Sequence, residues 1–132
     1  MGTNKNNKEA KTQGDSGRQA KQASLVELDA LLRHPSLVAR INAVLELGER
    51  LKHETIPEAV EMLERAVTDA RNRKVRLRGY TTAELIVVML LGAKDNAVKL
   101  RAERLMEQFD NDSRDTILWA ASTARDAQPQ AA

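Results

Sequence analysis

The sequence predicts an all-α fold: a short right-handed solenoid of about three antiparallel helical hairpins, built from six helices. Three observations support this prediction. Apolar residues recur at helical spacing in every periodic segment, helix start signals precede most of these segments, and the connections between them are short. An irregular six-helix bundle is the alternative, because the same pattern also fits helices that pack without a repeat.

The two ends of the chain differ in composition from the middle. Residues 1–23 hold five Lys and Arg residues against two acidic residues, and few apolar side chains. Such a segment buries too little surface to offset the entropy of ordering it. We therefore expect a disordered basic tail over 1–23, a helical repeat domain over 24–127 and a disordered C-terminal tail over 128–132.

Composition limits the class of protein. The net charge of the whole chain is +2, and the basic tail accounts for 5 − 2 = +3, so the remainder sums to −1. A nearly neutral folded part argues against a surface that binds polyanions everywhere. The chain has no cysteine, and therefore no disulfide framework or thiolate metal site. Its longest apolar run is far shorter than the roughly 20 residues that span a bilayer, and the polar N-terminus does not resemble a signal peptide. We expect a soluble cytoplasmic protein without a membrane partner.

The first three helices are predicted from their start signals. Ser24 and Glu27 have the spacing of a capping box, in which side chain and backbone satisfy each other's free N–H groups, and His34-Pro35 ends this first helix. A second helix is expected over 36–53. Thr55 is expected to cap a third, with Pro57 in its first turn.

The central helix is predicted over 81–92. Seven consecutive apolar residues, 85–91, leave no polar face, so this segment must be covered on every side. Thr81 and Glu84 form a second capping box, and Gly92 is a natural C-terminal stop. The run Ile86-Val87-Val88 also suits a buried strand, but a lone strand would have no partner.

Two helices and one ambiguous stretch complete the chain. Residues 71–80 are either a basic loop that ends at the Thr81 cap or the first turns of the central helix, bent at Gly79. Asp95 is expected to cap the fifth helix. Asp112 or Ser113 is expected to open the sixth, whose apolar residues run from Ile117 to Ala124.

An internal repeat supports the solenoid. Ala59-Val60 recurs as Ala97-Val98, 38 positions later, and a repeat of this length is typical of arrays of helical hairpins. Residues 34–48, His-Pro-Ser-Leu-Val-Ala-Arg-Ile-Asn-Ala-Val-Leu-Glu-Leu-Gly, resemble the inner helix of a HEAT repeat. Val75-Arg76 and Ser113-Arg114 open weaker matches.

A rival resemblance is to tetratricopeptide repeats. The pattern Ala59-x-x-x-Leu63-x-x-Ala66 fits their second helix, although Arg101 and Arg104 occupy positions that should be apolar or small. Both families are scaffolds that bind proteins, peptides or sometimes nucleic acid. Either resemblance therefore implies interaction rather than chemistry.

Reactive motifs are missing from the sequence. There is no phosphate-binding glycine loop, no nucleophile elbow and no His-Glu-x-x-His zinc motif. His34 and His53 lie at opposite ends of one predicted helix and cannot share a site within one chain. We therefore expect no enzymatic activity, no cofactor and no metal.

The one concentration of charge is a basic stretch, which has two interpretations. Five cations in eight residues can bind phosphates, as a nucleic-acid-binding site would. Alternatively, the HEAT resemblance implies that Arg76 pairs with an acidic turn residue of a neighbouring repeat, with Asp69, Asp110 and Asp112 as candidates. The cations are Arg71, Arg73, Lys74, Arg76 and Arg78.

The sequence thus favours a non-catalytic adaptor or regulatory module that offers its second, fourth and sixth helices to a protein partner. A nucleic-acid-binding protein using the 71–78 stretch is the alternative. The end hairpin, which carries the single tryptophan, also suits a second copy of the chain. The expected partner contacts are Leu37, Arg40, Arg73, Arg76, Arg78 and Trp119.

Overall fold

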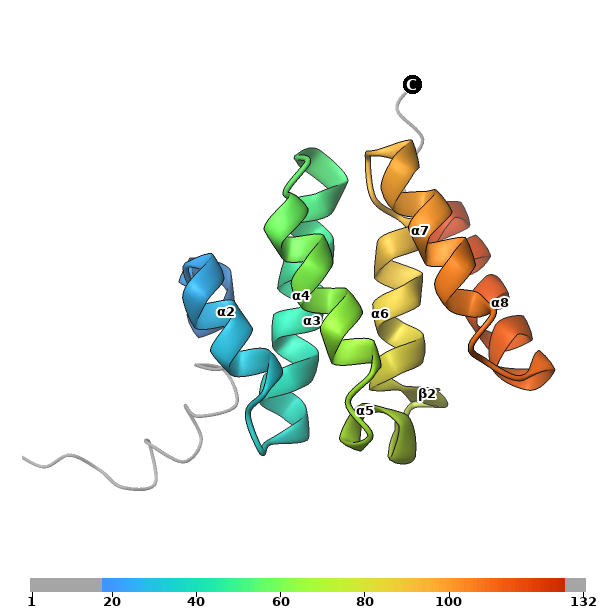
Figure 1. Ribbon diagram of the computed structural model, residues 1–132, viewed down its shortest axis with the longest axis horizontal. Helices are drawn as coiled ribbons and strands as arrows, with labels where there is room; N and C mark the ends of the chain where they lie inside the picture. Colours follow the sequence, from blue (N-terminus) through green and yellow to red (C-terminus); the bar gives the residue numbers. More distant parts are fainter. Residues whose placement is uncertain (1–17, 128–132) are drawn as a thin grey trace, which may run out of the picture.

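The computed structural model describes residues 18–127, which are mostly helical (Figure 1). A helical turn over 18–22 precedes the named elements. These are α2 (Leu25–Leu32), α3 (Leu37–His53), α4 (Pro57–Val67), α5 (Arg71–Lys74), β1 (Arg76–Leu77), β2 (Tyr80–Thr81), α6 (Thr82–Leu91), α7 (Asn96–Met106) and α8 (Asn111–Ala127). The all-α prediction is confirmed except for the small hairpin β1–β2.

Three of the predicted helix starts are confirmed in atomic detail. Ser24 Oγ accepts the Glu27 backbone N–H at 3.2 Å, and Glu27 Oε1 accepts the Ser24 N–H at 3.1 Å. The same reciprocal pair joins Thr81 and Glu84 at the start of α6. Asp95 Oδ1 accepts the Ala97 N–H at 2.9 Å. These caps satisfy N–H groups that the first turn of a helix leaves without partners.

Two predicted caps are wrong. Ile56, not Thr55, precedes α4, and it makes no side-chain cap. The reason is Pro57, whose fixed φ and missing N–H place it at the first helical position. At α8 the cap is Asp110, whose Oδ1 accepts the Ser113 N–H at 2.8 Å, so the helix begins before Asp112 and Ser113.

The predicted N-terminal boundary also needs correction. Residues 1–17 and 128–132 lie outside the described residues, but 18–23, assigned to the tail, are part of the structure. Ala20 and Ala23 are buried, because methyl side chains fit where larger ones would not. Arg50 of α3 donates to the Ala23 carbonyl at 2.7 Å and the Lys21 carbonyl at 3.3 Å, which holds this segment against the domain.

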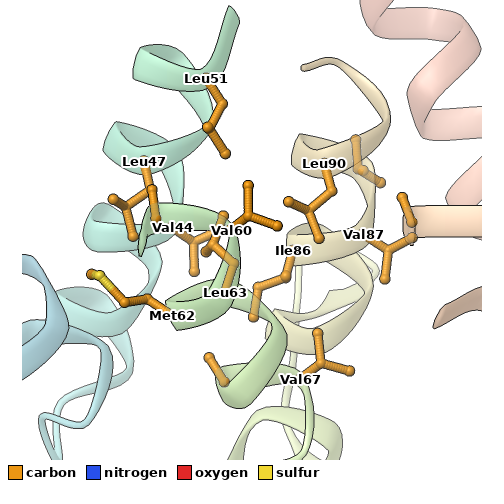
Figure 2. Close-up of a cluster of buried hydrophobic side chains, with 14 of the residues drawn as sticks. Val44, Leu47, Leu51, Val60, Met62, Leu63, Val67, Ile86, Val87 and Leu90 are labelled. Carbon is orange, nitrogen blue, oxygen red and sulfur yellow. The ribbon is translucent and has the colours of Figure 1, made fainter. Parts of the chain in front are cut away.

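Helix α6 is the centre of the structure. It contacts α3, α4, α7 and α8, and Figure 1 places it between the α3–α4 pair and the α7–α8 pair. Its apolar side chains point in several directions. Figure 2 shows Ile86 and Leu90 directed toward α3 and α4, whereas Val87 points to the opposite side. All three are fully buried, so α6 belongs to the core on both sides.

The larger half of the core lies among α3, α4 and α6 (Figure 2). Each fully buried aliphatic side chain contributes about 1.5–3 kcal/mol through removal of apolar surface from water. The residues that meet there are Val44, Leu47 and Leu51 of α3, Val60, Leu63 and Val67 of α4, and Ile86 and Leu90 of α6.

Gly48 allows α3 and α6 to approach each other closely. A Cβ placed on Gly48 would lie 2.5 Å from Met89 Sδ and 2.8 Å from Met89 Cβ. Because the Cβ of Met89 is fixed by its backbone, rotation of the methionine side chain cannot relieve this contact fully. The pair Leu47-Gly48 therefore determines how near the two helices lie.

Substitution of Gly48 by alanine is predicted to destabilise the protein by about 1–3 kcal/mol, the usual effect of overpacking a core. Urea unfolding followed by circular dichroism measures this change. Gly92→Ala is the matched control, because a Cβ there meets only ordinary contacts at 3.5 Å or more. The control should stay within about 0.5 kcal/mol of the parent protein; equal effects of both substitutions would contradict the close-approach argument.

The ambiguous stretch 71–80 is neither a loop throughout nor the first turns of the central helix. It contains the short helix α5 and an antiparallel hairpin that ends at the Thr81 cap, with Arg76 opposite Thr81 and Leu77 opposite Tyr80. Arg78 and Gly79 at its tip both have positive φ, 56° and 91°. Positive φ at both central residues defines the type I′ turn, whose twist suits a two-residue hairpin.

Candidate functional site

Arg40 was expected to contact a partner, but it is buried, with 4% of its surface exposed. Its Nε donates to Asn72 Oδ1 at 2.9 Å, and its Nη1 donates to the carbonyls of His34 and Pro35 at 2.8 and 2.9 Å. Asn72, also buried, donates onward to the Ala66 carbonyl at 2.8 Å. The guanidinium thus satisfies polar groups at the α2–α3 turn and ties them to α5, so it is a structural residue.

The charge of Arg40 is balanced by its surroundings. Burial, and next the nearby cation of Arg71, lower the pKa of Arg40, whereas the carboxylate of Asp69 opposes them. Hydrogen bonds from the Arg71 side chain in turn lower the pKa of Asp69. Arg40, Asp69 and Arg71 therefore form one charged group, which joins the α2–α3 turn to the α4–α5 turn.

Replacing Arg40 by methionine is predicted to destabilise the protein by about 3 kcal/mol, because it leaves buried carbonyl and amide oxygens without a donor. Denaturant unfolding measures the loss. Lys74→Met, at an exposed cation nearby, is the control and should stay within about 0.5 kcal/mol of the parent. Equal stability of both variants would contradict the structural role of Arg40.

Three cations of the basic stretch have partners inside the chain. Arg71 pairs with Asp69 at 2.9 Å. The guanidinium of Arg73 donates to the Val67 carbonyl at 2.9 Å and lies 5.2 Å from the ring centre of Phe109, a cation–π distance. These contacts fix the side chains of Arg71 and Arg73 against the domain.

Arg76, the third of these cations, pairs with Glu84 at 3.0 Å and also donates to the Gly79 carbonyl. Its expected partners, Asp69, Asp110 and Asp112, are wrong. Glu84 is 1% exposed and already accepts the Thr81 N–H for the cap of α6, so a buried carboxylate at the base of the hairpin attracts Arg76 more strongly than the exposed Asp110. Glu84 thereby links the hairpin to the start of the central helix.

Lys74 and Arg78 are the remaining cations, and both are exposed. Neither forms an ion pair with a side chain among residues 18–124. Of the five predicted phosphate-binding cations, these two are therefore the ones without an ion-pair or hydrogen-bond partner in that range, and Arg78 lies at the hairpin tip.

Trp119 lies on the surface, with 62% of its area exposed. Beside it is an apolar hollow of about 290 Å³ between α6 and α8, which we call the Trp119 groove. The groove is lined by Tyr80, Leu85, Val88, Trp119, Ala120, Thr123 and Ala124. Of these residues, the sequence predicted Trp119 alone as a contact, because the others come from three elements that only the fold brings together.

A second hollow adjoins the groove and shares Tyr80 and Trp119 with it. Its other lining residues include Arg78 at the hairpin tip and Asp115 of α8, one charge of each sign. Of the residues predicted as contacts, Arg78 and Trp119 are therefore neighbours. Leu37 is half-buried at the start of α3 and does not line either hollow.

Further apolar side chains are exposed on α3 and α8. Val38 and Leu45 are each close to half exposed, and Leu118 lines a separate cavity of about 450 Å³ among α6, α7 and α8. In the part of the chain that the structure describes, no group of three acidic or histidine side chains could hold a metal ion. No helix of that part is long and apolar enough to cross a membrane.

Comparison of the chain with protein-family models, with curated proteins and with solved structures finds no match.

Arg78 is the one non-glycine residue among 18–127 with positive φ, a conformation that asparagine tolerates better than arginine. Arg78→Asn is therefore predicted to stabilise the protein by about 1 kcal/mol. The midpoint of denaturant unfolding measures the gain. Lys74→Asn removes the same charge from ordinary helical backbone and should give no gain; an equal rise in both would point to charge repulsion instead of turn geometry.

Proposed function

We propose that this chain is a non-catalytic helical-repeat module that binds a protein partner on the surface of α3, α6 and α8, with the Trp119 groove as the principal contact. The exposure of Trp119 beside an apolar hollow carries this proposal. Tryptophan is among the residues that contribute most to binding at protein interfaces, and Trp119 is available for such a contact.

The repeat architecture within this proposal is a HEAT-like stack of the hairpins α2–α3, α4–α6 and α7–α8. Its support is a set of contacts between successive outer helices. Arg65 of α4 lies 3.8 Å from Asp29 of α2, and Arg101 of α7 pairs with Glu64 of α4. Gly48, the glycine of the HEAT-like Leu-Gly, lies where α3 meets α6. The contacts between outer helices support a stack of hairpins, and the place of Gly48 agrees with the HEAT-like pattern.

The two histidines fit structural roles. His34 Nδ1 accepts the Ser36 N–H at 2.9 Å in the turn before α3, and His53 lies 3.2 Å from Glu49 on one exposed helix face. The groove itself is lined by apolar, hydroxyl and aromatic side chains suited to contact. A binding module rather than an enzyme is the interpretation that these contacts favour.

Nucleic-acid binding is the second candidate, favoured by the exposed Lys74 and Arg78. Two cations give a shallow dependence of affinity on salt, whereas five would give a steep one. The charge reversal K74E distinguishes the two candidates, because Lys74 is exposed and lines neither hollow. It should weaken retention of nucleic acid, and it should not change retention of a protein partner from nuclease-treated lysate.

Trp119→Ala is predicted to reduce retention of the protein partner at least tenfold, the expected effect of removing a tryptophan from the centre of an interface. The measurement is a quantitative pull-down from nuclease-treated lysate with the full chain. Val26→Ala is the matched control, because Val26 is 81% exposed on α2 and does not line the groove. A partner lost equally with both variants, or with neither, would contradict this site.

A further inference from the structure

The surface around Trp119 carries a projecting side chain directly beside a hollow of the same chemistry. Trp119 is largely exposed, and the groove next to it is walled by Leu85, Val88 and Ala120. When two molecules meet about a two-fold axis, the exposed side chain of each copy can occupy the hollow of the other copy. Such isologous contacts are the commonest basis of homodimers.

The two charged side chains of the adjoining hollow also suit a second copy of the chain. Arg78 and Asp115 both line this hollow, and neither forms an ion pair with a side chain among residues 18–124. A strongly acidic or strongly basic occupant would meet one unfavourable charge there. A second copy of the chain avoids this when the two-fold axis passes between the two charges, because Asp115 of each copy then lies opposite Arg78 of the other.

We propose that this surface is a homodimer interface, in which Trp119 of each copy enters the Trp119 groove of the other and Arg78 pairs with Asp115 across the axis. This self-association goes beyond the proposed function. Since the dimer covers the groove, a second copy and a protein partner exclude each other. Dimerisation then sets the fraction of chains that are available for the partner.

The expected dimer is weak and depends on concentration. Two tryptophans and their hollows form the apolar centre, and each aromatic side chain buries about 150–250 Å², so the contact is at the small end of specific interfaces. Sedimentation velocity of the full chain, from low micromolar to near-millimolar concentration, measures the monomer–dimer equilibrium. Trp119→Ala should raise the dissociation constant at least tenfold, and Val26→Ala should leave it unchanged.

A charge exchange tests the two-fold geometry. R78E alone places two acidic groups opposite each other, and D115R alone places two cations opposite each other, so each variant should dimerise several-fold more weakly than the parent. An equimolar mixture of R78E and D115R copies has attractive pairs at both contacts. The mixture should therefore dimerise more strongly than either variant alone, approaching the parent.

Circular dichroism and the unfolding midpoint establish whether each variant is folded. If R78E is unfolded, the neutral variants R78N and D115N replace R78E and D115R in the same mixing experiment.

A chain that is monomeric at all concentrations, a dimer unaffected by Trp119→Ala, or a mixture no stronger than its components would each overturn the proposal. Retention of a protein partner that depends on Trp119 in a monomeric chain would leave the proposed function standing by itself. A dimer that depends on Trp119, in a chain that retains no protein partner, would support the dimer and contradict the proposed function.

Discussion

The structure depends on the burial of α6, in which seven of ten residues are buried and Leu85, Met89 and Leu91 are partly exposed. A helix with no polar face must be enclosed, and α3, α4, α7 and α8 are arranged around it for that reason. Burial also restricts how its N-terminus can be satisfied, because water cannot reach it. Thr81 and Glu84 supply the acceptors from within the chain, and Glu84 simultaneously holds Arg76. One carboxylate thus completes the core helix and positions the hairpin beside it.

Features set by neighbouring residues were predictable from the sequence. The capping boxes at Ser24 and Thr81, the Asp95 cap and the enclosed run 85–91 each depend on side chains within a few positions. The start of α4 was misjudged because two local signals compete there, and proline at the first helical position outweighs a threonine cap one residue too early. The β1–β2 hairpin was missed because its turn contains Arg-Gly, whereas type I′ turns usually contain Asn-Gly.

Features set by distant residues were not predictable in the same way. The role of Arg40 depends on Asn72, 32 positions later, and the role of Arg73 depends on Phe109. A run of cations looks the same in sequence whether it faces solvent or holds turns together. Of the candidate contacts, Arg78 and Trp119 line one hollow, and the rest of their surroundings come from β2, α6 and α8. No local pattern marks a hollow formed by three elements.

The bond between Arg40 and Asn72 bears on how the molecule unfolds. Stacked helical hairpins ordinarily fray from their ends, since each contacts only its neighbours. Here one guanidinium joins the α2–α3 turn to α5, and α6 is shared by the helices on either side, so α2 through α6 should open as one cooperative unit. Helix α8 is different, because small side chains such as Ala120 lie between it and α6, and hollows flank it. Because α8 is the last described helix and packs mainly on α6, we expect it to open at a lower free energy than the unit α2 through α6.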